Sequence, residues 1–377
     1  MITSTSLAPL RLLIVAIAGA VAPTLAVSQE GHGIVRQSIT WRPGTGGPTR
    51  VTEQVSGTNQ LLQAVHAVSE RVVWASGHRG VVLRTLDGGT TWKRLPVPDS
   101  DSLEFRDVHA ASANTAWILA AGPGARSRIY RTTNGGASWD LQFRNADTAA
   151  FYDCFTMLDA RRGVAYSDAS HGRTNILRTT NGGVNWTLVK QGDVPAPLPA
   201  EGAFASSGQC VVQSGPNTVL IATGAPGARM LRSTDAGARW TTSETPFVRA
   251  AVSGTTGMAF RDVSRSGGRG MAVAADINRL RLDTSSAALG VTSDGGRTWT
   301  LRLRPPLPGA LSAVTLVGGA NGKIAVVAGF GGAFATDDDG FSWHVINGSL
   351  YTGATSAGRT AWITGGGGRI TRLDWEK

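Results

Sequence analysis

Charged residues that directly follow an aromatic residue recur along the sequence, and they could support two kinds of chemistry. They occur in Phe105-Arg106-Asp107, Phe151-Tyr152-Asp153 and Phe260-Arg261-Asp262, and a fourth segment contains Glu201 and Phe204. Opposed carboxyl groups about 5 to 9.5 Å apart hydrolyse glycosidic bonds, whereas arginine donates paired hydrogen bonds to carboxylate or phosphate groups. The candidate binding residues are therefore Arg106, Asp107, Tyr152, Asp153, Glu201, Arg261 and Asp262.

These charged residues have three alternative interpretations. Facing an open cleft, Asp153 with Glu201, or Asp107 with Asp153, could form the carboxyl pair of a glycoside hydrolase. The arginines could instead bind acidic groups of a peptide. In the third interpretation, the Arg-Asp neighbours form salt bridges that join parts of the scaffold. The residue types alone leave all three open.

Other residues that carry chemistry lack a recognisable motif. Cys154 and Cys210 are the only cysteines, and they could form a disulfide or remain two buried thiols. The six histidines show no metal-ligand spacing. Runs of glycine precede β-type segments rather than helices, so no phosphate-binding loop is indicated. We expect neither a metal nor a cofactor.

One octapeptide with the pattern Ser/Thr-x-Asp/Asn-x-Gly-x-x-Trp occurs six times, with successive copies 44 to 59 residues apart. Asp and Asn side chains accept backbone N–H bonds, glycine permits positive φ, and a hydroxyl can close the turn. The octapeptide therefore predicts a hairpin, with scaffold residues rather than site residues at its acidic or amide position: Asp87, Asn134, Asn181, Asp235, Asp294 and Asp338.

Short β-type segments accompany each octapeptide. Residues 80–84 precede the first copy, and residues 72–75 form another apolar segment upstream. Each unit therefore reads as four short strands, which is typical of a propeller blade. Together with a high glycine count, 49 of 377 residues, this predicts an all-β fold: a seven-bladed β-propeller of four-stranded blades.

The seventh unit is incomplete. Residues 360–373 repeat the pattern of the earlier strands, but the chain stops where the last hairpin should follow. The segment Ser38–Trp41 lies before the first unit and has β-type residues. We predict that a strand near Ile39 completes the C-terminal blade, because closing the ring protects sheet edges that would otherwise favour aggregation.

The N-terminus has the features of a secretory signal peptide. A single Arg11 precedes the apolar residues 12–22, which are followed by small residues. This run is too short for a membrane span of about 20 residues. We therefore predict a signal peptide over residues 1–28, a single propeller domain over residues 29–377, no transmembrane segment, and a periplasmic or secreted location.

The octapeptides resemble Asp-boxes, also called bacterial neuraminidase repeats, which occur in sialidases, in some β-glucan-degrading propellers and in sortilin-like receptors. Across nearly the whole mature chain, the units are most similar to those of the photosystem II stability/assembly factor family, as in residues 122–139. The segments 151–168 and 192–210 depart from that basic repeat. The resemblance implies that the octapeptides are structural hairpins between the outer strands.

The family resemblance also implies a non-enzymatic scaffold. We expect an exported, monomeric propeller that binds a protein or peptide partner at its loop-rich face. The segments 105–108, 151–154, 202–204 and 260–263 align as entries to innermost strands, so we expect the seven candidate binding residues to line one mouth of the central channel. Nucleic acid is not expected for an exported protein, although the formal net charge is +10. The alternative is a glycoside hydrolase. Its sialidase form would pair Tyr152 with Glu201, but the sequence lacks the Arg-Ile-Pro element of sialidases.

Overall fold

The computed structural model describes residues 46–224, 228–247, 252–285, 288–318 and 322–376. The predicted signal peptide and the strand predicted near Ile39 lie outside these residues. Among the described residues, no helix combines the length and the apolar character that crossing a membrane requires.

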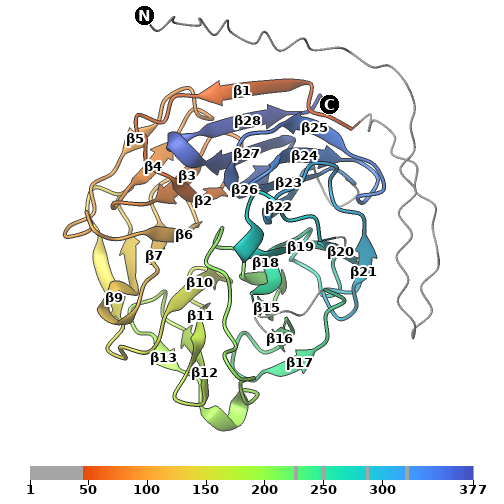
Figure 1. Cartoon of the computed structure of the whole chain (residues 1–377). Helices are drawn as coiled ribbons and strands as arrows, with labels where there is room; N and C mark the ends of the chain where they lie inside the picture. Colours follow the sequence, from red (N-terminus) through yellow and green to blue (C-terminus); the bar gives the residue numbers. More distant parts are fainter. Residues whose placement is uncertain (1–45, 225–227, 248–251, 286–287, 319–321, 377) are drawn as a thin grey trace, which may run out of the picture. The chain divides into compact units, whose positions relative to one another are not determined.

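Seven four-stranded antiparallel sheets form the described chain, and Figure 1 shows them arranged as a ring around a central axis. Six sheets follow the chain without crossovers, and the seventh joins both ends of the described chain. The predicted all-β, seven-bladed propeller is therefore confirmed.

The first four blades run from the innermost strand to the outermost. Blade 1 contains β2 (Leu62–Ala67), β3 (Val73–Gly77), β4 (Val82–Thr85) and β5 (Lys93–Arg94). Blade 2 contains β6 (Phe105–Ala110), β7 (Ala116–Ala120), β8 (Arg128–Thr132) and β9 (Asp140–Arg144). Blade 3 contains β10 (Tyr152–Met157), β11 (Gly163–Ser170), β12 (Arg173–Thr179) and β13 (Thr187–Leu188). Blade 4 contains β14 (Val211–Gly215), β15 (Thr218–Ala222), β16 (Met230–Ser233) and β17 (Thr241–Ser243).

The remaining blades follow the same order. Blade 5 contains β18 (Ser253–Phe260), β19 (Gly270–Asp276), β20 (Leu289–Thr292) and β21 (Thr300–Arg302). Blade 6 contains β22 (Leu311–Leu316), β23 (Ala325–Gly329), β24 (Gly332–Thr336) and β25 (His344–Asn347). Blade 7 contains β26 (Tyr351–Ala357), β27 (Thr360–Gly365), β28 (Ile370–Asp374) and β1 (Arg50–Gln54). The short 3-10 helices are η1 (Gly124–Arg126), η2 (Gln191–Asp193), η3 (Ile277–Arg279) and η4 (Gly366–Gly368).

A strand from the N-terminal part of the chain completes blade 7, but it is not the segment that the sequence pattern favoured. The pairing strand is β1, antiparallel to β28 from Arg50 opposite Asp374 to Gln54 opposite Ile370. The prediction of closure is correct, and the predicted location near Ile39 is replaced by residues 50–54. Four of the five β1 residues are exposed, so an outermost strand of this kind carries no apolar alternation that would reveal it.

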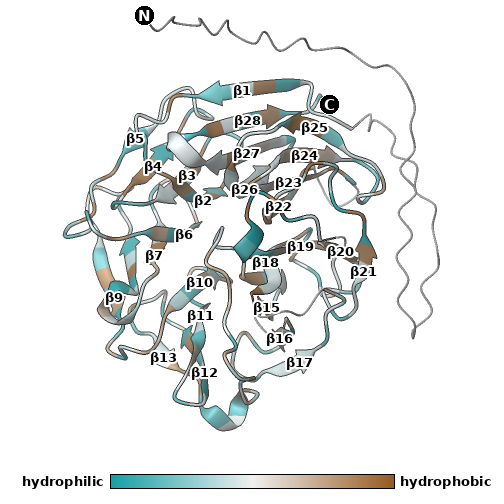
Figure 2. Ribbon diagram, in the orientation of Figure 1, coloured by the Kyte–Doolittle hydropathy of each residue, from teal (hydrophilic) through white to brown (hydrophobic). Residues whose placement is uncertain are grey.

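The hydrophobic core lies between neighbouring blades, where the sheets pack face to face. One cluster joins Trp74 and Leu95 of blade 1 to Phe105, Ile118 and Tyr130 of blade 2. Figure 2 shows apolar residues mixed with polar ones along the strands. All five residues of β7 are buried, whereas both residues of β5 are exposed.

Each octapeptide forms the turn between the third and fourth strands of a blade. In blade 1, the Thr85 hydroxyl donates to Asp87 Oδ1 at 2.8 Å and accepts the Gly89 N–H at 2.8 Å. The Asp87 carboxylate in turn accepts the Thr91 N–H at 2.9 Å. These bonds lower the pKa of Asp87 below its usual value, because they stabilise the charged form.

An arginine in the third strand of several blades bonds to the next blade; where the blade has an octapeptide, this arginine lies just before it. Arg84 donates to the Ala113 carbonyl at 2.6 Å, Arg178 to Ala236 at 2.9 Å and Arg372 to Gly88 at 3.0 Å. Each acceptor belongs to the following blade, with blade 1 following blade 7. We call these residues, with Arg131 and Arg232 at the equivalent register in β8 and β16, the strap arginines.

The strap arginines should stabilise the closed ring. Replacing Arg84 with Met removes the bond to Ala113 and the cation–π contact with Trp74, whose ring centroid lies 5.3 Å from the guanidinium carbon. We expect a loss of about 1.5 to 3 kcal/mol in the free energy of unfolding, measured by urea denaturation. Arg144→Met, at an exposed position, is the control and should change it by less than about 0.5 kcal/mol. Equal effects of both substitutions would contradict the strap role.

Candidate functional site

Four of the predicted site residues lie at the start of innermost strands. Arg106 and Asp107 belong to β6, and Tyr152 and Asp153 belong to β10. Arg106 and Asp153 are the extra residues of β-bulges at matching positions. The same bulge recurs in other blades, so the axis is surrounded at this level by Gln63, Arg106, Asp153, Thr256, Ser312 and Thr352.

Arg261 and Asp262 do not join this set. They follow the last residue of β18, so they lie at the opposite end of an innermost strand from Arg106. The expectation that all seven residues line one mouth is therefore corrected. The aligned segments match in residue type, but β18 is rich in Gly and Thr and has only Met258 and Phe260 as large apolar residues. The sequence therefore gives little sign of where this innermost strand begins and ends.

The side chain of Arg261 has a structural position between blades 5 and 6. It is buried and donates to the carbonyls of Val317 and Ile324, at 2.8 and 3.0 Å. Asp262 adopts a positive φ of 53° and pairs with Arg265 at 3.1 Å. These bonds to backbone carbonyls at the seam between blades 5 and 6 agree with the scaffold interpretation of Arg261.

Asp107 and Asp153 are buried carboxyl groups. Asp107 accepts the Phe155 N–H at 2.8 Å, and burial raises its pKa well above the usual value. Burial, followed by the neighbouring charge of Asp168, also raises the pKa of Asp153. Burial likewise raises the pKa of Asp168. The two interacting carboxyl groups, Asp153 and Asp168, therefore favour a state in which they share a proton.

Glu201 and Tyr152 are also enclosed. Glu201 is 1% exposed and forms a two-point ion pair with Arg229, at 2.6 and 2.7 Å. Its Oε2 also accepts the Leu198 N–H at 3.0 Å. Tyr152 packs edge-on against Phe143, and burial raises its pKa. The nominated hydrolase pairs therefore do not face each other across an open cleft.

Arg106 is the most accessible of the four residues at the start of β6 and β10. Its guanidinium pairs with Glu104 Oε2, at 2.6 Å from Nη2 and 2.9 Å from Nε. This ion pair is partly exposed. Arg106 is consequently neutralised by a residue just before its own strand rather than presented as a free cation.

A segment before β14 crosses the channel and explains this burial. Gln209 reaches from blade 4 to the opposite blades: Nε2 donates to the Val314 and Ala354 carbonyls, both at 2.9 Å, and Oε1 accepts the Val314 N–H. Ser206 bonds to Gln63 of blade 1 through its carbonyl and to Thr256 of blade 5 through its hydroxyl. We call Glu201–Gln209 the cross-channel segment; in Figure 1 the light green chain after β13 runs past the centre of the ring.

A disulfide fixes the end of the cross-channel segment. Cys154 of β10 and Cys210 are joined, with a Cα–Cα distance of 5.8 Å. Of the two possibilities that the sequence left open, a disulfide or two buried thiols, the structure has the disulfide. It ties the segment to blade 3, next to the buried Asp153 and the Glu201–Arg229 ion pair.

The channel on the octapeptide side of this segment contains a cavity of about 380 Å³. His66 and His109, from adjacent innermost strands, line it with ring centroids 4.5 Å apart. Burial lowers the pKa of His66 to about 4 and that of His109 well below its usual value, so both rings are neutral at pH 7. Among the described residues, no group of three His, Cys, Asp or Glu side chains is placed to hold a metal ion.

A separate groove of about 980 Å³ lies where blade 7 meets blade 1. We call it the seam groove. Its charged residues are Arg79, Arg94 and Arg369, with Glu53 and Asp101. Its walls come from the segments 53–60 and 366–369, so it opens on the side of the loops that connect second to third strands. The sequence analysis missed it because the groove forms only when the two ends of the described chain meet.

Comparison with known proteins identifies the fold and not a family. No family model and no curated protein sequence matches the chain. A YCF48 structure with a bound D1 peptide has a TM-score of 0.62 at 16% identity, over 90% of this chain and 100% of that one. YCF48 from Cyanidioschyzon merolae has a TM-score of 0.59 at 17% identity, over 86% of this chain and 98% of that one. The resemblance to assembly-factor propellers is therefore confirmed at the level of the fold.

Enzymes share the same architecture. The GH74 enzyme of Niastella koreensis has a TM-score of 0.59 at 15% identity, over 85% of this chain and 53% of the enzyme chain. A catalytically inactive virginiamycin B lyase from Staphylococcus aureus, with quinupristin, has a TM-score of 0.60 at 14% identity, over 87% of this chain and 99% of the lyase chain. Since both binding proteins and enzymes use this fold, the function must be argued from residues.

The Asp153–Asp168 pair should make stability depend on pH. A carboxyl group whose pKa is higher in the folded than in the unfolded protein stabilises the fold at pH values below its unfolded pKa, about 3.9. This stabilisation is lost as the pH rises through the pKa of the group in the folded protein. Asp153→Asn removes a carboxyl group that must carry a charge in a buried position at high pH. We therefore expect its free energy of unfolding to exceed that of the wild type by on the order of 1 kcal/mol at pH 8 and to differ little at pH 4. Urea denaturation at both pH values measures this. Asp140→Asn, at an exposed position, should show no such dependence; a parallel loss in all three proteins would contradict the assignment.

Proposed function

We propose that the protein is an exported scaffold that binds an acidic peptide segment of a partner protein in the seam groove. The observation that carries the proposal is the presence of three arginines around one groove: Arg79, Arg94 and Arg369. A groove of about 980 Å³ can take several residues of an extended peptide. Arginine is suited to carboxylate groups because its planar fork donates two parallel hydrogen bonds.

Two of these arginines are available for a ligand. Arg79 is held by a tight turn, with a positive φ of 52°, and Arg94 is in the outermost strand β5. Both are exposed, and neither side chain forms a hydrogen bond or ion pair with another residue of the described chain. Arg369 lies 3.6 Å from Glu53, so it is partly neutralised. The groove therefore presents net positive charge on a rigid support.

The groove also offers uncharged contacts. Val55 is 87% exposed and is one of the groove's lining residues. Gly366 and Gly367 expose backbone without large side chains, and Gly367 adopts a positive φ of 69°. Backbone groups and one apolar contact beside arginines suit a peptide better than a small sugar, which needs aromatic platforms and paired acids.

The comparisons support this proposal at the level of the fold. The YCF48 structure that holds a D1 peptide shares the propeller architecture at low identity, which supports the fold as a peptide-binding scaffold. The predicted signal peptide supports an exported location. The glycoside hydrolase alternative rests on the carboxyl groups nominated from the sequence, and a GH74 enzyme shares the fold. These groups, Asp107, Asp153 and Glu201, are all buried.

Binding of fluorescent peptides tests the groove. The probes are Glu-rich 12-residue peptides, with a free or an amidated C-terminus, and a Gln-substituted control peptide. The double variant Arg79→Ala/Arg94→Ala should weaken binding of the Glu-rich peptides at least about 10-fold, because each shielded charge-assisted bond contributes about 1.5 to 3 kcal/mol. Fluorescence anisotropy at low and high salt measures this, and salt should weaken wild-type binding.

The matched control is Arg144→Ala/Arg173→Ala, which removes two exposed arginines outside the groove. It should leave peptide affinity within about twofold of the wild type. Equal loss in both double variants would indicate attraction by overall charge and would reject the seam groove as the site.

A further inference from the structure

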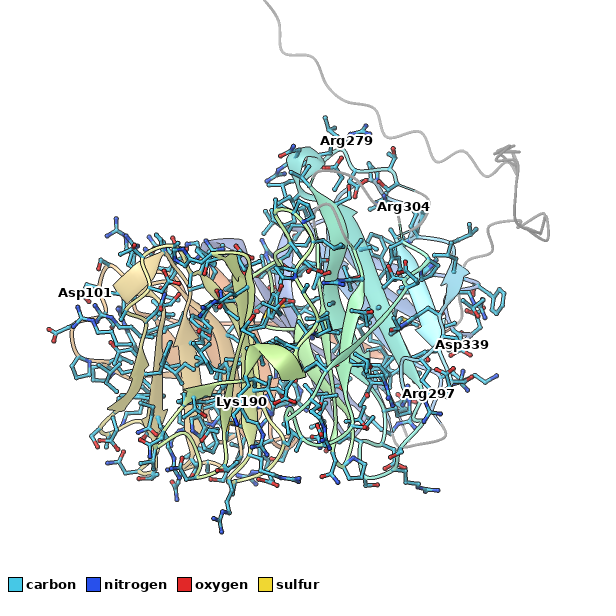
Figure 3. The ribbon with its side chains drawn as sticks, turned by 90° about the horizontal axis from the view of Figure 1, so that it is seen from below. Asp101, Lys190, Arg279, Arg297, Arg304 and Asp339 are labelled. Carbon is cyan, nitrogen blue, oxygen red and sulfur yellow. A yellow bond between two sulfur atoms is a disulfide. The ribbon has the colours of Figure 1, made fainter. Side chains whose placement is uncertain are left out.

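A loop in blade 5 projects from the ring and presents leucines and arginines together. It connects β19 to β20 and includes η3, and we call its residues Ile277–Leu282 the blade 5 knob. Leu280 and Leu282 are 40% and 70% exposed, and Arg279 and Arg281 are exposed as well. Figure 3 shows Arg279 at the top of the molecule, on the side away from Arg297 of the blade 5 octapeptide.

The knob is rigidly supported. Asp283, which is fully buried, accepts the Asp276 N–H at 2.9 Å and the Ser285 N–H at 2.8 Å. The backbone of the knob is fixed too, since the Ala310 N–H donates to the Leu280 carbonyl at 2.6 Å. Arg304 braces the same region by donating to the Gly309 carbonyl at 2.7 Å. The leucines are therefore held out in solvent by the fold rather than exposed by a loose loop.

The charge of the knob is one-sided. Residues 277–282 contain two arginines and no acidic residue. The carboxylate next to them at Asp283 is buried, and Asp276 caps η3 by accepting the Asn278 N–H at 3.0 Å. Neither Arg279 nor Arg281 has a hydrogen-bonded or ion-paired partner among the described residues. The knob thus combines exposed apolar side chains with unpaired cations.

We propose that the blade 5 knob docks on the surface of an anionic phospholipid bilayer. The knob is convex, so its binding partner must offer either a pocket that matches it or a surface that can deform around it. Leucine side chains enter the boundary between headgroups and acyl chains, while arginines bind phosphate groups. The knob projects from the loop side of the ring, so its tip can reach a flat surface. The formal net charge of +10 favours an anionic surface at long range.

Co-sedimentation with vesicles tests the knob. The protein sample is the form that an expression host secretes, and mass spectrometry determines its N-terminus. Vesicles contain either phosphatidylcholine alone or 30% phosphatidylglycerol. We expect preferential binding to the anionic vesicles, a loss of about 30-fold in partition coefficient for Arg279→Gln/Arg281→Gln, and a loss of at least about 10-fold for Leu280→Ala/Leu282→Ala.

Matched controls separate the knob from general charge and apolar exposure. Leu301→Ala/Leu303→Ala replaces leucines that are 42% and 43% exposed elsewhere, and Arg144→Gln/Arg173→Gln replaces exposed arginines outside the knob. Both should bind vesicles within about twofold of the wild type. Knob variants that bind like the wild type, or equal binding of the wild type to both vesicle types, would overturn the proposal.

A fluorescent label reports insertion directly. Both native cysteines are in the disulfide, so Leu282→Cys supplies a single thiol for an environment-sensitive dye. Its emission should shift to the blue on anionic vesicles, whereas the dye at Leu303→Cys should not shift. An unshifted dye at residue 282 would overturn docking through this tip. The seam groove variant Arg79→Ala/Arg94→Ala should keep wild-type vesicle binding, so this result is independent of the peptide proposal.

Discussion

The contact between one blade and the next is the interaction on which the rest of the structure depends. A single four-stranded sheet leaves both faces apolar, and only the neighbouring blades cover them. The strap arginines act at the same seams: Arg84, Arg178 and Arg372 each donate to a backbone carbonyl of the following blade. Blades 5 and 6 carry Val291 and Ala335 at that register, and the seam between these blades is instead bonded by Arg261 and Arg269. These five arginines therefore serve ring closure rather than a ligand.

The local features of the fold could be predicted from the sequence, and the features that depend on distant contacts could not. Six octapeptides predicted hairpins and hence the blades, because turn chemistry is set within eight residues. The strand β1 escaped detection because its exposed residues show no apolar alternation. The displacement of Arg261 and Asp262 has a similar cause, since β18 contains few large apolar residues. The burial of Asp153 and Glu201 depends on a segment that reaches several blades, which no local pattern encodes.

The cross-channel segment changes where function can lie. Gln209 bonds to blades 6 and 7, and Ser206 to blades 1 and 5, so the centre of the ring on that side is occupied by the chain itself. The buried Glu201–Arg229 pair and the disulfide hold it in place. A buried ion pair of this kind fixes a conformation more than it adds stability. Because the axial mouth is filled, the accessible charged surface on this side lies at the rim, where the seam groove is found.

The seam groove and the blade 5 knob lie on the side of the propeller that carries the loops between second and third strands. The arginines of these two places differ in one respect from the arginines that bond within the scaffold. Arg84, Arg178 and Arg372 each donate to a backbone carbonyl of the following blade, and Arg106 pairs with Glu104, whereas Arg79, Arg94, Arg279 and Arg281 have no hydrogen-bonded or ion-paired partner among the described residues. An arginine that has no bonded partner stabilises the fold no more than a neutral residue at the same position would. The loop side therefore carries arginines that form no bonds within the scaffold. A partner with acidic groups, whether peptide or lipid, could bind them.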